Sequence, residues 1–556
     1  MQLRNSLAIA LPSLCSIAVQ AQAWSWANPI GSPNSATHMH HVRPYTSDQI
    51  LVCGAYTATT LVLGEHSLGN QGQNDGYIAL LDADGTYSWA TTFGGSNNED
   101  VVDVSSNEDG AFAVIGNFSS FFLSIGDTTL ANGGEADAFI ARFNADRTIA
   151  WVRQIGGPEI EEVVSVKLDP LGNTYVSGQV INKFTLTTIH VFLRKYSPSG
   201  GLIWERTGEA QAGQPKYTSM AMDGAQNVYL SGGMFGHLTF GGTTLSSIDG
   251  FSAFIITYSA AGEFLDHLLT NTYFNVNELQ WHGNHLYACA ERREWNIGWG
   301  WPLADSKVHV IKYASDLEPV WTRHFGGETP SQSLDIATAL TIDPDENVYV
   351  TGSFFSDTLF FANDTLPNPY HINYYYPQIF VAKYNAEGDE VWGKSFGGIH
   401  SDQATSIVAF GNDRFYLAGE FESDPLTFGT HELNNTSTLE SFYVHLFPER
   451  YGRKPMGYLA AFDVGTPTGS IDRASTSSIR LWPNPAADKI MLQVDPVQRL
   501  GFTLRIHSLD GRLAHESSHA AGTSPVETSL IDLVPGSYYI TIRSGANSNT
   551  LKFVKH

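Results

Sequence analysis

The sequence is poor in cysteine, in positive charge and in charged residues of either sign. It has 3 Cys in 556 residues, which excludes a disulfide framework and a cysteine-rich metal site. Against 31 Lys and Arg stand 56 Asp and Glu, a formal net charge of −25, so nucleic-acid binding through a basic face is not expected. Charged residues make up 16%, but hydrophobic residues reach 42% and aromatics 12%, which excludes a wholly disordered chain.

The sequence also has no apolar run long enough for a membrane span, which takes roughly 18 to 20 residues. Its clearest apolar run, Leu7 to Val19, follows the basic Arg4 and precedes Ala21-Gln22-Ala23. This order is typical of a cleavable export signal over residues 1–23. The mature chain is therefore expected to begin near Trp24 and to be exported.

What the sequence does contain is a repeat. A Phe-x-Ala-Lys-Tyr stretch followed by a Trp strand that ends at Gly-Gly recurs, as in FVAKYNAEGDEVWGKSFGG (380–398) and FIARFNADRTIAWVRQIGG (139–157). The copies of the first stretch begin at Tyr77, Phe139, Phe192, Phe254, His309, Phe380 and Tyr443. A Tyr-Val-x-Gly type of strand precedes each copy and closes at Gly54, Gly116, Gly178, Gly232, Ala290, Gly352 and Gly419.

Each repeat predicts four short strands, because apolar and polar residues alternate and no helical period is sustained. The predicted order is the Trp strand, a short apolar strand, the Tyr-Val-x-Gly strand and the Phe-x-Ala-Lys-Tyr strand. One such sheet cannot bury both faces alone, so the repeats must stack. We predict an all-β seven-bladed β-propeller over residues 24–447. An open array, or a ring of six or eight blades, is the alternative, because the copy near Asp266 lacks its Trp.

These repeats resemble the bacterial SBBP propeller repeats, which combine G-N-x-Y-V-x-G, F-V-A-K-Y and W-x-x-x-F-G-G segments. The resemblance covers roughly residues 24–447 and implies a propeller scaffold, with little said about activity. The recurrent Trp residues are expected to pack between blades: Trp89, Trp151, Trp204, Trp321 and Trp392.

The C-terminal residues read differently. After a connector over 448–478, rich in Thr, Ser and Gly in its second half, residues 479–556 show amphipathic strands and Pro-Gly and Asp-Gly turns that predict a small β-sandwich. This segment resembles the type A sorting domain of the type IX (Por) secretion system of Gram-negative bacteria. The resemblance rests on Pro483, Asn484, Pro485, Asp510, Gly511, Gly536, Tyr538, Lys552 and Lys555. It implies export through the periplasm to the cell surface or medium, with the translocon and its sortase as partners. An ordinary C-terminal β-domain is the alternative.

Several motifs suggest chemistry but fit ordinary structure better. His515-Glu516-Ser517-Ser518-His519 has the H-E-x-x-H spacing, which holds zinc only on a helix, and here a strand or loop is expected. The Asp-rich turns at 82–85 and 343–345 lack calcium-loop spacing. Cys53 and Cys289 lie in units that are not neighbours and are expected to be buried, unpaired thiols. We expect no catalytic residue, no metal site and no cofactor.

Two long loops are unusual in their aromatic content. Unit five carries Trp295, Trp299 and Trp301, and unit six carries Tyr370, Tyr374, Tyr375 and Tyr376. Equivalent loops of adjacent blades share one side of a propeller, so these rings predict an aromatic surface for a glycan or a protein; the alternative is that they only pack against one another. The sequence thus favours an adhesion or binding scaffold, because no repeat is set apart by an unusual set of titratable residues. A propeller hydrolase or a quinoprotein-like oxidoreductase is the alternative.

Overall fold

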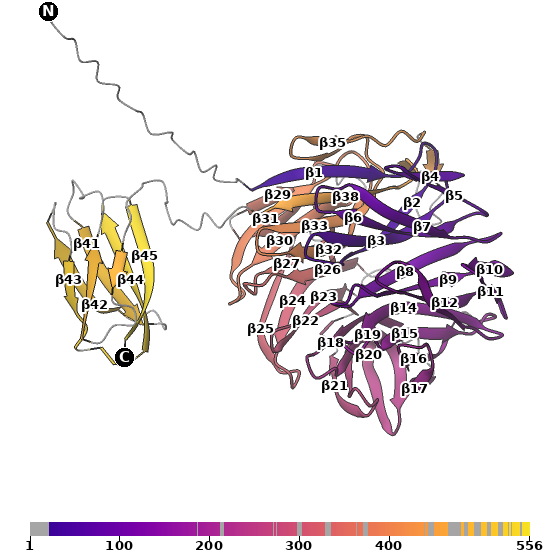
Figure 1. The fold of residues 1–556 in the computed structure, drawn as a ribbon, viewed down its shortest axis with the longest axis horizontal. Coiled ribbons are helices and arrows are strands. Elements are labelled where there is room, and N and C mark those ends of the chain that lie inside the picture. The colour runs from indigo at the N-terminus through magenta and orange to yellow at the C-terminus, as the bar shows by residue number, and fades with distance from the viewer. Residues whose placement is uncertain are drawn as a thin grey trace, which may run out of the picture. The chain divides into compact units, whose positions relative to one another are not determined.

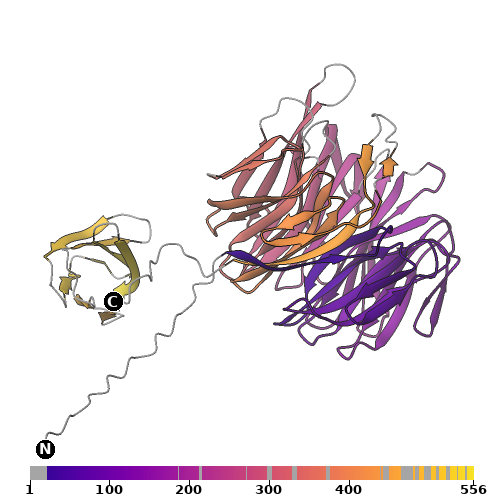
Figure 2. The same ribbon diagram turned by 90° about the horizontal axis from the view of Figure 1, so that it is seen from above.

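The computed structural model describes residues 22–464 and 480–555, apart from 186, 212–215, 271, 274, 297–302, 328–334, 363, 371–375, 439, 443–449, 483–487, 494–501, 509–512, 521–525, 532, 535 and 545–546. The chain has two compact units, Gln22–Val464 and a C-terminal unit that begins at Gly465. Every regular element of the described residues is a strand, which confirms the all-β prediction (Figures 1 and 2). Among these residues no helix has the length and apolar character that crossing a membrane requires.

The larger unit is built from quartets, each of four antiparallel strands side by side. From first to fourth strand, the quartets of the described chain are β2 (Thr37–Pro44), β3 (Gln49–Tyr56), β6 (Asp75–Asp82) and β7 (Tyr87–Phe93); β8 (Glu99–Ser106), β9 (Phe112–Phe118), β12 (Asp137–Phe143) and β13 (Ile149–Ile155); β14 (Ile160–Leu168), β15 (Thr174–Ile181), β16 (Thr188–Tyr196) and β17 (Leu202–Gln211); β18 (Lys216–Met222), β19 (Val228–Phe240), β20 (Thr243–Tyr258) and β21 (Phe264–Thr270); β22 (Asn275–His282), β23 (His285–Asn296), β24 (Leu303–Tyr313) and β25 (Pro319–Gly327); β26 (Ile336–Ile342), β27 (Val348–Phe354), β30 (Gln378–Tyr384) and β31 (Glu390–Phe396); and β32 (Asp402–Phe410), β33 (Arg414–Phe421), β38 (Met456–Asp463) and β1 (Ala23–Ile30).

The quartets stack through their first strands. Each first strand contacts the first strand of the next quartet, and β32 of the last quartet contacts β2 of the first. The middle strands, such as β12 and β30, are buried on both faces, because a neighbouring quartet covers each side. The circuit of first strands makes the unit propeller-like.

Short hairpins extend several quartets between their second and third strands. These are β4 (Thr60–Leu63) with β5 (His66–Gly69), β10 (Phe122–Ile125) with β11 (Thr128–Ala131), β28 (Thr358–Phe361) with β29 (Asp364–Pro367), and β34 (Leu426–Phe428) with β35 (His431–Leu433). A further pair, β36 (Glu440–Phe442) with β37 (Arg450–Gly452), follows in the last quartet.

The repeated glycine of the second strand has a steric reason. Gly54 pairs with Tyr77 of the third strand, and a Cβ on Gly54 would lie 1.9 Å from the carbonyl oxygen of His38 in the first strand. At the same place in the second quartet, a Cβ on Gly116 would lie 2.2 Å from the Asp100 carbonyl oxygen. A glycine is favoured at this place because a bulge in the first strand brings its backbone this close, although the fifth quartet has Ala290 there.

The predicted strand order within each repeat differs from the observed quartets by one strand. Each Trp strand pairs with the Phe-x-Ala-Lys-Tyr strand that precedes it, as Trp89 does with Leu80, so it is the fourth strand of a quartet and not the first strand of the next. One Trp strand is consequently left over at the N-terminus. This is β1, with Trp24 and Trp26, and it serves as the fourth strand of the last quartet.

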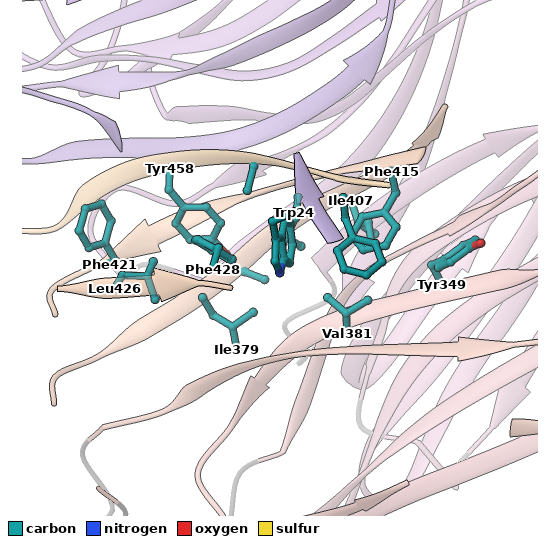
Figure 3. Close-up of a cluster of buried hydrophobic side chains, with 14 of the residues drawn as sticks. Trp24, Tyr349, Ile379, Val381, Ile407, Phe415, Phe421, Leu426, Phe428 and Tyr458 are labelled. Carbon is teal, nitrogen blue, oxygen red and sulfur yellow. The ribbon is translucent and has the colours of Figure 1, made fainter. Parts of the chain in front are cut away.

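Strand β1 is held in the last quartet by an aromatic core. Trp24 is 8% exposed, pairs with Phe462 and has its ring centroid 4.7 Å from Phe428 and 5.0 Å from Phe396. Figure 3 shows its side chain between Phe428 and Phe415. The first residues after the predicted export signal therefore complete the last sheet.

The predicted end of the propeller at residue 447 is wrong. The larger unit runs to Val464, and its last third strand is β38, where Tyr458 pairs with Gly419 as Tyr77 does with Gly54. The copy predicted at Tyr443 lies outside the described residues. The hairpins inserted after β33 delay the third strand, and its Tyr-Leu-Ala-Ala-Phe sequence lacks the Lys found in the copies that begin at Phe192, His309 and Phe380. The connector is thus shorter than the predicted 448–478.

The C-terminal unit contains two antiparallel sheets. One has the order β39 (Arg480–Trp482), β40 (Lys489–Gln493), β43 (Val526–Ser529), and the other β42 (Leu513–His519), β41 (Phe502–Ser508), β44 (Gly536–Ser544), β45 (Asn547–Lys555). Both contribute fully buried apolar side chains, such as Ile490 in the first sheet and Leu504, Ile506 and Ile540 in the second. Alternation along β41 and β44 supplies this core.

Candidate functional site

Each first strand carries a bulge opposite the residue that closes the second strand. The bulge leaves one residue without a partner across the sheet, and these residues are His40, Val102, Val164, Thr218, Asn277, Thr338 and Thr405. A bulge redirects the side chain of its extra residue. Four of them, His40, Val102, Thr338 and Thr405, line one hollow of about 280 Å³, so the bulges face a common axis.

Along one arc of the axis, the bulge side chains link each first strand to the next. Thr218 donates to the Val276 carbonyl, Asn277 Nδ2 to the Ala337 carbonyl at 2.7 Å, and Thr338 Oγ1 to the Ala404 carbonyl at 2.7 Å. Thr405 Oγ1 then donates to the Met39 carbonyl at 2.6 Å, from the last quartet to the first. These bonds satisfy carbonyls that the bulges leave free of the sheet.

The pattern changes between the first and fourth quartets. Val102 and Val164 have no polar group, and His40 Nε2 instead donates to both carboxylate oxygens of Asp100, at 2.9 and 3.0 Å. A hollow of about 400 Å³, here called the axial mouth, opens at this place. Its polar lining comprises His38, His40, Asn74, Asn98, Glu99, Asp100, Asn117 and Ser119.

Both imidazoles of the axial mouth are paired with carboxylates. His38 Nδ1 donates to Glu420 Oε1 at 3.0 Å, and this bond, with the charge of Glu420, raises the pKa of His38 against the effect of burial. Burial alone would lower the pKa of His40, but the charge and hydrogen bond of Asp100 raise it. The side chains of His38, His40 and Asp100 are 36%, 32% and 40% exposed, so a ligand can reach them.

Deeper along the axis lies a buried group of charges. Arg43 Nε is 3.3 Å from Asp103 Oδ1, and Arg43 Nη1 reaches across the axis to Glu278 Oε1 at 3.2 Å. Burial would raise the pKa of Asp103, but Arg43, His41 and Lys167 lower it to about 2. The Val166 and Leu340 amides donate to Asp103 and Glu278. Two cations and two anions are thus balanced, and His41 stays neutral because burial lowers its pKa to about 3.

The expectation that no repeat is set apart by titratable residues is wrong. The first repeat supplies His38, His40, His41 and Arg43 to the axis within β2. The signal in the sequence is the run Thr-His-Met-His-His-Val-Arg, which has no counterpart in the first strands of the other quartets. The bulge hides it, because one inserted residue breaks the alternation that assigns side chains to faces.

The predicted aromatic loops are described only in part. Tyr370 is 37% exposed, and the Tyr376 ring lies 5.5 Å from His400, edge to face. Trp295 lies in β23, opposite Ala304, in a part of the strand whose side chains are not described. Trp299, Trp301, Tyr374 and Tyr375 lie outside the described residues. Connections between second and third strands occur at the end where the first strand begins, as Thr37, Tyr56 and Asp75 show, so the described residues of these two connections lie on the face of the axial mouth.

Of the residues that predicted the sorting domain, those the structure describes lie in its strands β44 and β45. Gly536 begins β44, and the hydroxyl of the buried Tyr538 donates to the Val534 carbonyl at 2.8 Å. Lys552 pairs with Tyr539, and Lys555 Nζ lies 3.9 Å from Asp488. Pro483, Asn484, Pro485, Asp510 and Gly511 lie outside the described residues.

The H-E-x-x-H string, the Asp-rich turn at 343–345 and the two cysteines lie in strands and turns of the described structure. His515 and His519 lie in the strand β42, and His519 Nε2 lies 2.9 Å from Ser517 Oγ. Asp343 caps its own turn, with Oδ1 accepting the amides of Asp345 and Asn347. Cys53 and Cys289 are buried free thiols in β3 and β23, and burial raises the pKa of both. Among the residues described, no three His, Cys, Asp or Glu side chains gather as a metal site.

Comparison with known families identifies the C-terminal unit. Residues 480–556 match the family described as "Secretion system C-terminal sorting domain". This match confirms the predicted type IX sorting domain, with a start one residue later than predicted. Such domains mark proteins that this system secretes to the cell surface or the extracellular space, and the protein therefore acts outside the cell.

Similarity over the rest of the chain is distant. The regulatory protein FlaEY of Caulobacter vibrioides is 30% identical over 133 residues, 24% of this chain and 13% of that protein. The WD repeat-containing protein L264 of Acanthamoeba polyphaga mimivirus is 28% identical over 127 residues, 22% of this chain and 8% of that protein. The chain spans a small part of these relatives.

Solved structures with similar arrangements are also distant. Polysaccharide lyase Uly1 has a TM-score of 0.38 at 7% identity, over 81% of this chain and 94% of that chain. Drosophila Semaphorin 1a has a TM-score of 0.36 at 8% identity, over 81% and 90%. The phage phi92 endosialidase has a TM-score of 0.33 at 8% identity, over 95% and 87%.

Proposed function

We propose that the quartets form a closed seven-bladed β-propeller of the SBBP type. Three contacts between the last and first quartets support closure: the Thr405–Met39 hydrogen bond, the Val42 amide donating to Ser406 Oγ at 3.2 Å, and the His38–Glu420 pair. Strand β1 completes the last sheet by pairing with β38, so the first and last strands of the larger unit lie side by side within one blade. Closure of this kind covers the outer faces of the first and last blades and leaves only short, protected sheet edges.

We propose that this propeller is a glycan-binding protein, made with an export signal over residues 1–23 and passed to the type IX translocon and sortase by residues 480–556. The observation that carries the binding proposal is the axial mouth. There the repeated side-chain bonds of the axis give way to a hollow lined by imidazoles, carboxylates and amides. Departures from a repeat at an open polar hollow are expected at functional sites.

The lining fits a polyhydroxylated ligand. Sugar hydroxyls both donate and accept hydrogen bonds, and the amides of Asn74 and Asn98 offer both partners. The mouth pairs each imidazole with a carboxylate, so it favours neither a strongly anionic nor a strongly cationic ligand. Tyr370 is exposed in a loop on the same face and offers a ring for stacking on a sugar.

We propose binding without turnover. His40 Nε2 is engaged by both oxygens of Asp100, and His38 Nδ1 by Glu420, which suits these groups to orient a ligand. A His held by a carboxylate can also serve as a general base, so hydrolysis is the second candidate. Chromatography of the bound glycan after long incubation distinguishes the two: binding predicts recovery of the intact glycan, and shortened products would show an enzyme.

A glycan array probed with the full secreted chain tests the proposal. The best glycan should then bind the Asn98→Ala and Asp100→Asn variants about tenfold more weakly by calorimetry, since each variant loses a hydrogen bond to the ligand. Asn144→Ala is the matched control, because Asn144 is an exposed amide in the turn between β12 and β13, at the other end of the strands. Unchanged affinity in both axial variants would reject the site.

A further inference from the structure

Two joints between neighbouring quartets each hold two buried carboxylates. Between the first and second quartets these are Asp75, at the start of β6, and Glu99, at the start of β8, with 0% and 1% exposure. Between the second and third they are Asp137, at the start of β12, and Glu161 in β14, with 0% and 6% exposure. The two joints are equivalent, since Asp75 pairs with Tyr56 and Asp137 with Phe118 at the same register of their quartets.

Each of the four carboxylates has one buried oxygen that no donor group of the protein reaches, and in the second joint the carboxyl groups of Glu161 and Asp137 lie within hydrogen-bonding reach of each other. The four oxygens are Asp75 Oδ1, Glu99 Oε2, Asp137 Oδ1 and Glu161 Oε2. The other oxygens accept main-chain amides, Asp75 Oδ2 from Gln71 at 2.9 Å, Glu99 Oε1 from Ser120 at 3.2 Å and Asp137 Oδ2 from Gly133 at 3.0 Å. Asp137 Oδ2 also accepts from the side-chain amide of Gln154. A buried carboxylate oxygen with no partner is costly, so something is expected to bind there.

The two carboxyl groups of a joint also oppose each other's ionisation. Burial, followed by the charge of Asp137, raises the pKa of Glu161 to about 7. Burial raises the pKa of Glu99 as well, and Asp75 adds to the shift. Either a shared proton or a bound cation relieves this repulsion.

Two other joints of the same molecule show what replaces the second carboxylate. Lys307 occupies the place of Asp137 in the fifth quartet, and Gln378 occupies it in the sixth. Asp335 and Asp402 are the acids that follow them. Lys307 Nζ donates to the Gly327 carbonyl at 3.3 Å, and Gln378 Nε2 to the Gly398 carbonyl at 3.0 Å. A positive or donor group therefore lies beside the second glycine of the Gly-Gly pair, and the amide of that glycine donates to the single acid, Gly327 to Asp335 at 2.9 Å and Gly398 to Asp402 at 2.7 Å.

The glycine pairs are shaped around this place. A Cβ on Gly94 would lie 2.1 Å from Asp75 Oδ2, and a Cβ on Gly156 would lie 2.1 Å from Asp137 Oδ2. The first glycine of each pair thus leaves room for the carboxylate. The second glycines, Gly95 and Gly157, correspond to the residues whose carbonyls bind Lys307 and Gln378 in the other joints.

We propose that each of these two joints binds a calcium ion between its two carboxylates, where Lys307 places its ammonium group in the fifth quartet. Calcium takes its ligands from carboxylate and main-chain oxygens, and no nitrogen or sulfur ligand is required. Only two acidic side chains serve each ion, so main-chain carbonyls and water complete its shell. Sites with few charged ligands bind in the range of about 0.1 to 1 mM, which suits an extracellular protein.

Thermal unfolding of the purified full chain in about 5 mM CaCl₂ and in EDTA tests the proposal, with calorimetry to count the ions. We expect calcium to raise Tm by about 2 to 4 °C and two ions to bind. The Asp75→Asn/Asp137→Asn double variant should lose this response, and Asp137→Lys, which copies Lys307, should lose half of the bound calcium. Asp402→Asn is the matched control, a buried acid whose joint has Gln378 in place of a second acid, and it should keep the calcium response.

A wild-type Tm that is the same in calcium and in EDTA, with no heat of binding, would overturn the proposal. A Tm that then rises as the pH is lowered through about 7 would show that a proton, and not a cation, joins the carboxyl pairs. A calcium response that survives in the Asp75→Asn/Asp137→Asn variant would equally overturn it, because the ion would bind elsewhere. Because the wild-type measurement decides by itself, the proposal stays testable if a variant fails to fold.

Discussion

Thr405 Oγ1 donates to the carbonyl oxygen of Met39 at 2.6 Å, although 366 residues separate them. The bond joins the first strand of the last quartet to the first strand of the first. It repeats the bond of Thr338 to Ala404 one quartet earlier. The same kind of hydrogen bond therefore joins neighbouring first strands within the repeat and joins the last quartet to the first.

Removing the Thr405 hydroxyl should weaken this closure. Thr405→Val keeps the side-chain shape but leaves the Met39 carbonyl without its donor, and we expect a loss of about 1 kcal/mol in the free energy of unfolding. Urea denaturation of the variant and the wild type measures this difference in the free energy of unfolding. Thr46→Val is the control, because the Thr46 hydroxyl bonds to the exposed Asp48 and its removal should cost less than about 0.5 kcal/mol. Equal effects of the two variants would contradict the proposed role of Thr405.

Trp24 should be the most sensitive position of β1. Its ring is buried among Phe396, Phe428 and Phe462, so Trp24→Ala should destabilise the larger unit by about 3 to 5 kcal/mol. Trp26→Ala provides the comparison, since Trp26 is only partly buried and bonds through Nε1 to the Ala83 carbonyl. Its effect should be clearly smaller. If both substitutions unfold the protein at the same urea concentration, β1 does not depend on the Trp24 core.

Acid should weaken the folded state through His41. Burial, followed by the charge of Arg43, lowers the pKa of His41 from 6.5 to about 3. Below pH 6.5 the unfolded chain takes up a proton on this side chain and the folded chain does not. The free energy of unfolding should therefore decrease as the pH is lowered from 6.5 to about 3. His38 and His40 act in the opposite sense, because their raised pKa values stabilise the folded state at low pH and this contribution is lost as the pH rises.

His41→Gln isolates that contribution. The Tm of the variant should fall less steeply than that of the wild type between about pH 6.5 and pH 4.5. Differential scanning calorimetry across this range measures both slopes. Superimposable slopes would mean that His41 is not the buried neutral group described above.

Export should depend on the C-terminal unit. Deleting residues 479–556 should leave the chain in the periplasm, and fusing them to a periplasmic reporter should carry the reporter to the surface or the medium. Cell fractionation with immunoblotting measures both. A truncated chain that reaches the medium at the wild-type level would contradict the sorting role.

Much of the fold can be predicted from the sequence because it is repeated and local. Alternation of apolar residues marks the strands, and Gly54, Gly116 and their counterparts mark one place in every quartet. The sequence does not show which of the four strands begins each sheet, because the order of strands in a repeat is the same whichever strand is counted first. Only the pairing of Trp89 with Leu80, and of Trp24 with Phe462, shows which strand begins a sheet.

The candidate site was harder to predict for a different reason. His40 sits on a bulge, and one extra residue reverses the faces to which the following side chains point. Asp100 and Glu420 meet His40 and His38 only after neighbouring quartets stack, across 60 and 382 residues. The aromatic loops stood out because their residues are adjacent in the sequence, whereas the axial mouth is assembled from separate repeats.

Hydrogen–deuterium exchange of the full chain with and without its best array glycan tests the central claim most directly. If the glycan occupies the axial mouth, protection should concentrate in peptides covering 37–44 and 97–103, and peptides covering 143–149 at the other end of the strands should be unchanged. Protection confined to 143–149, or to the C-terminal unit, would contradict binding at the axis.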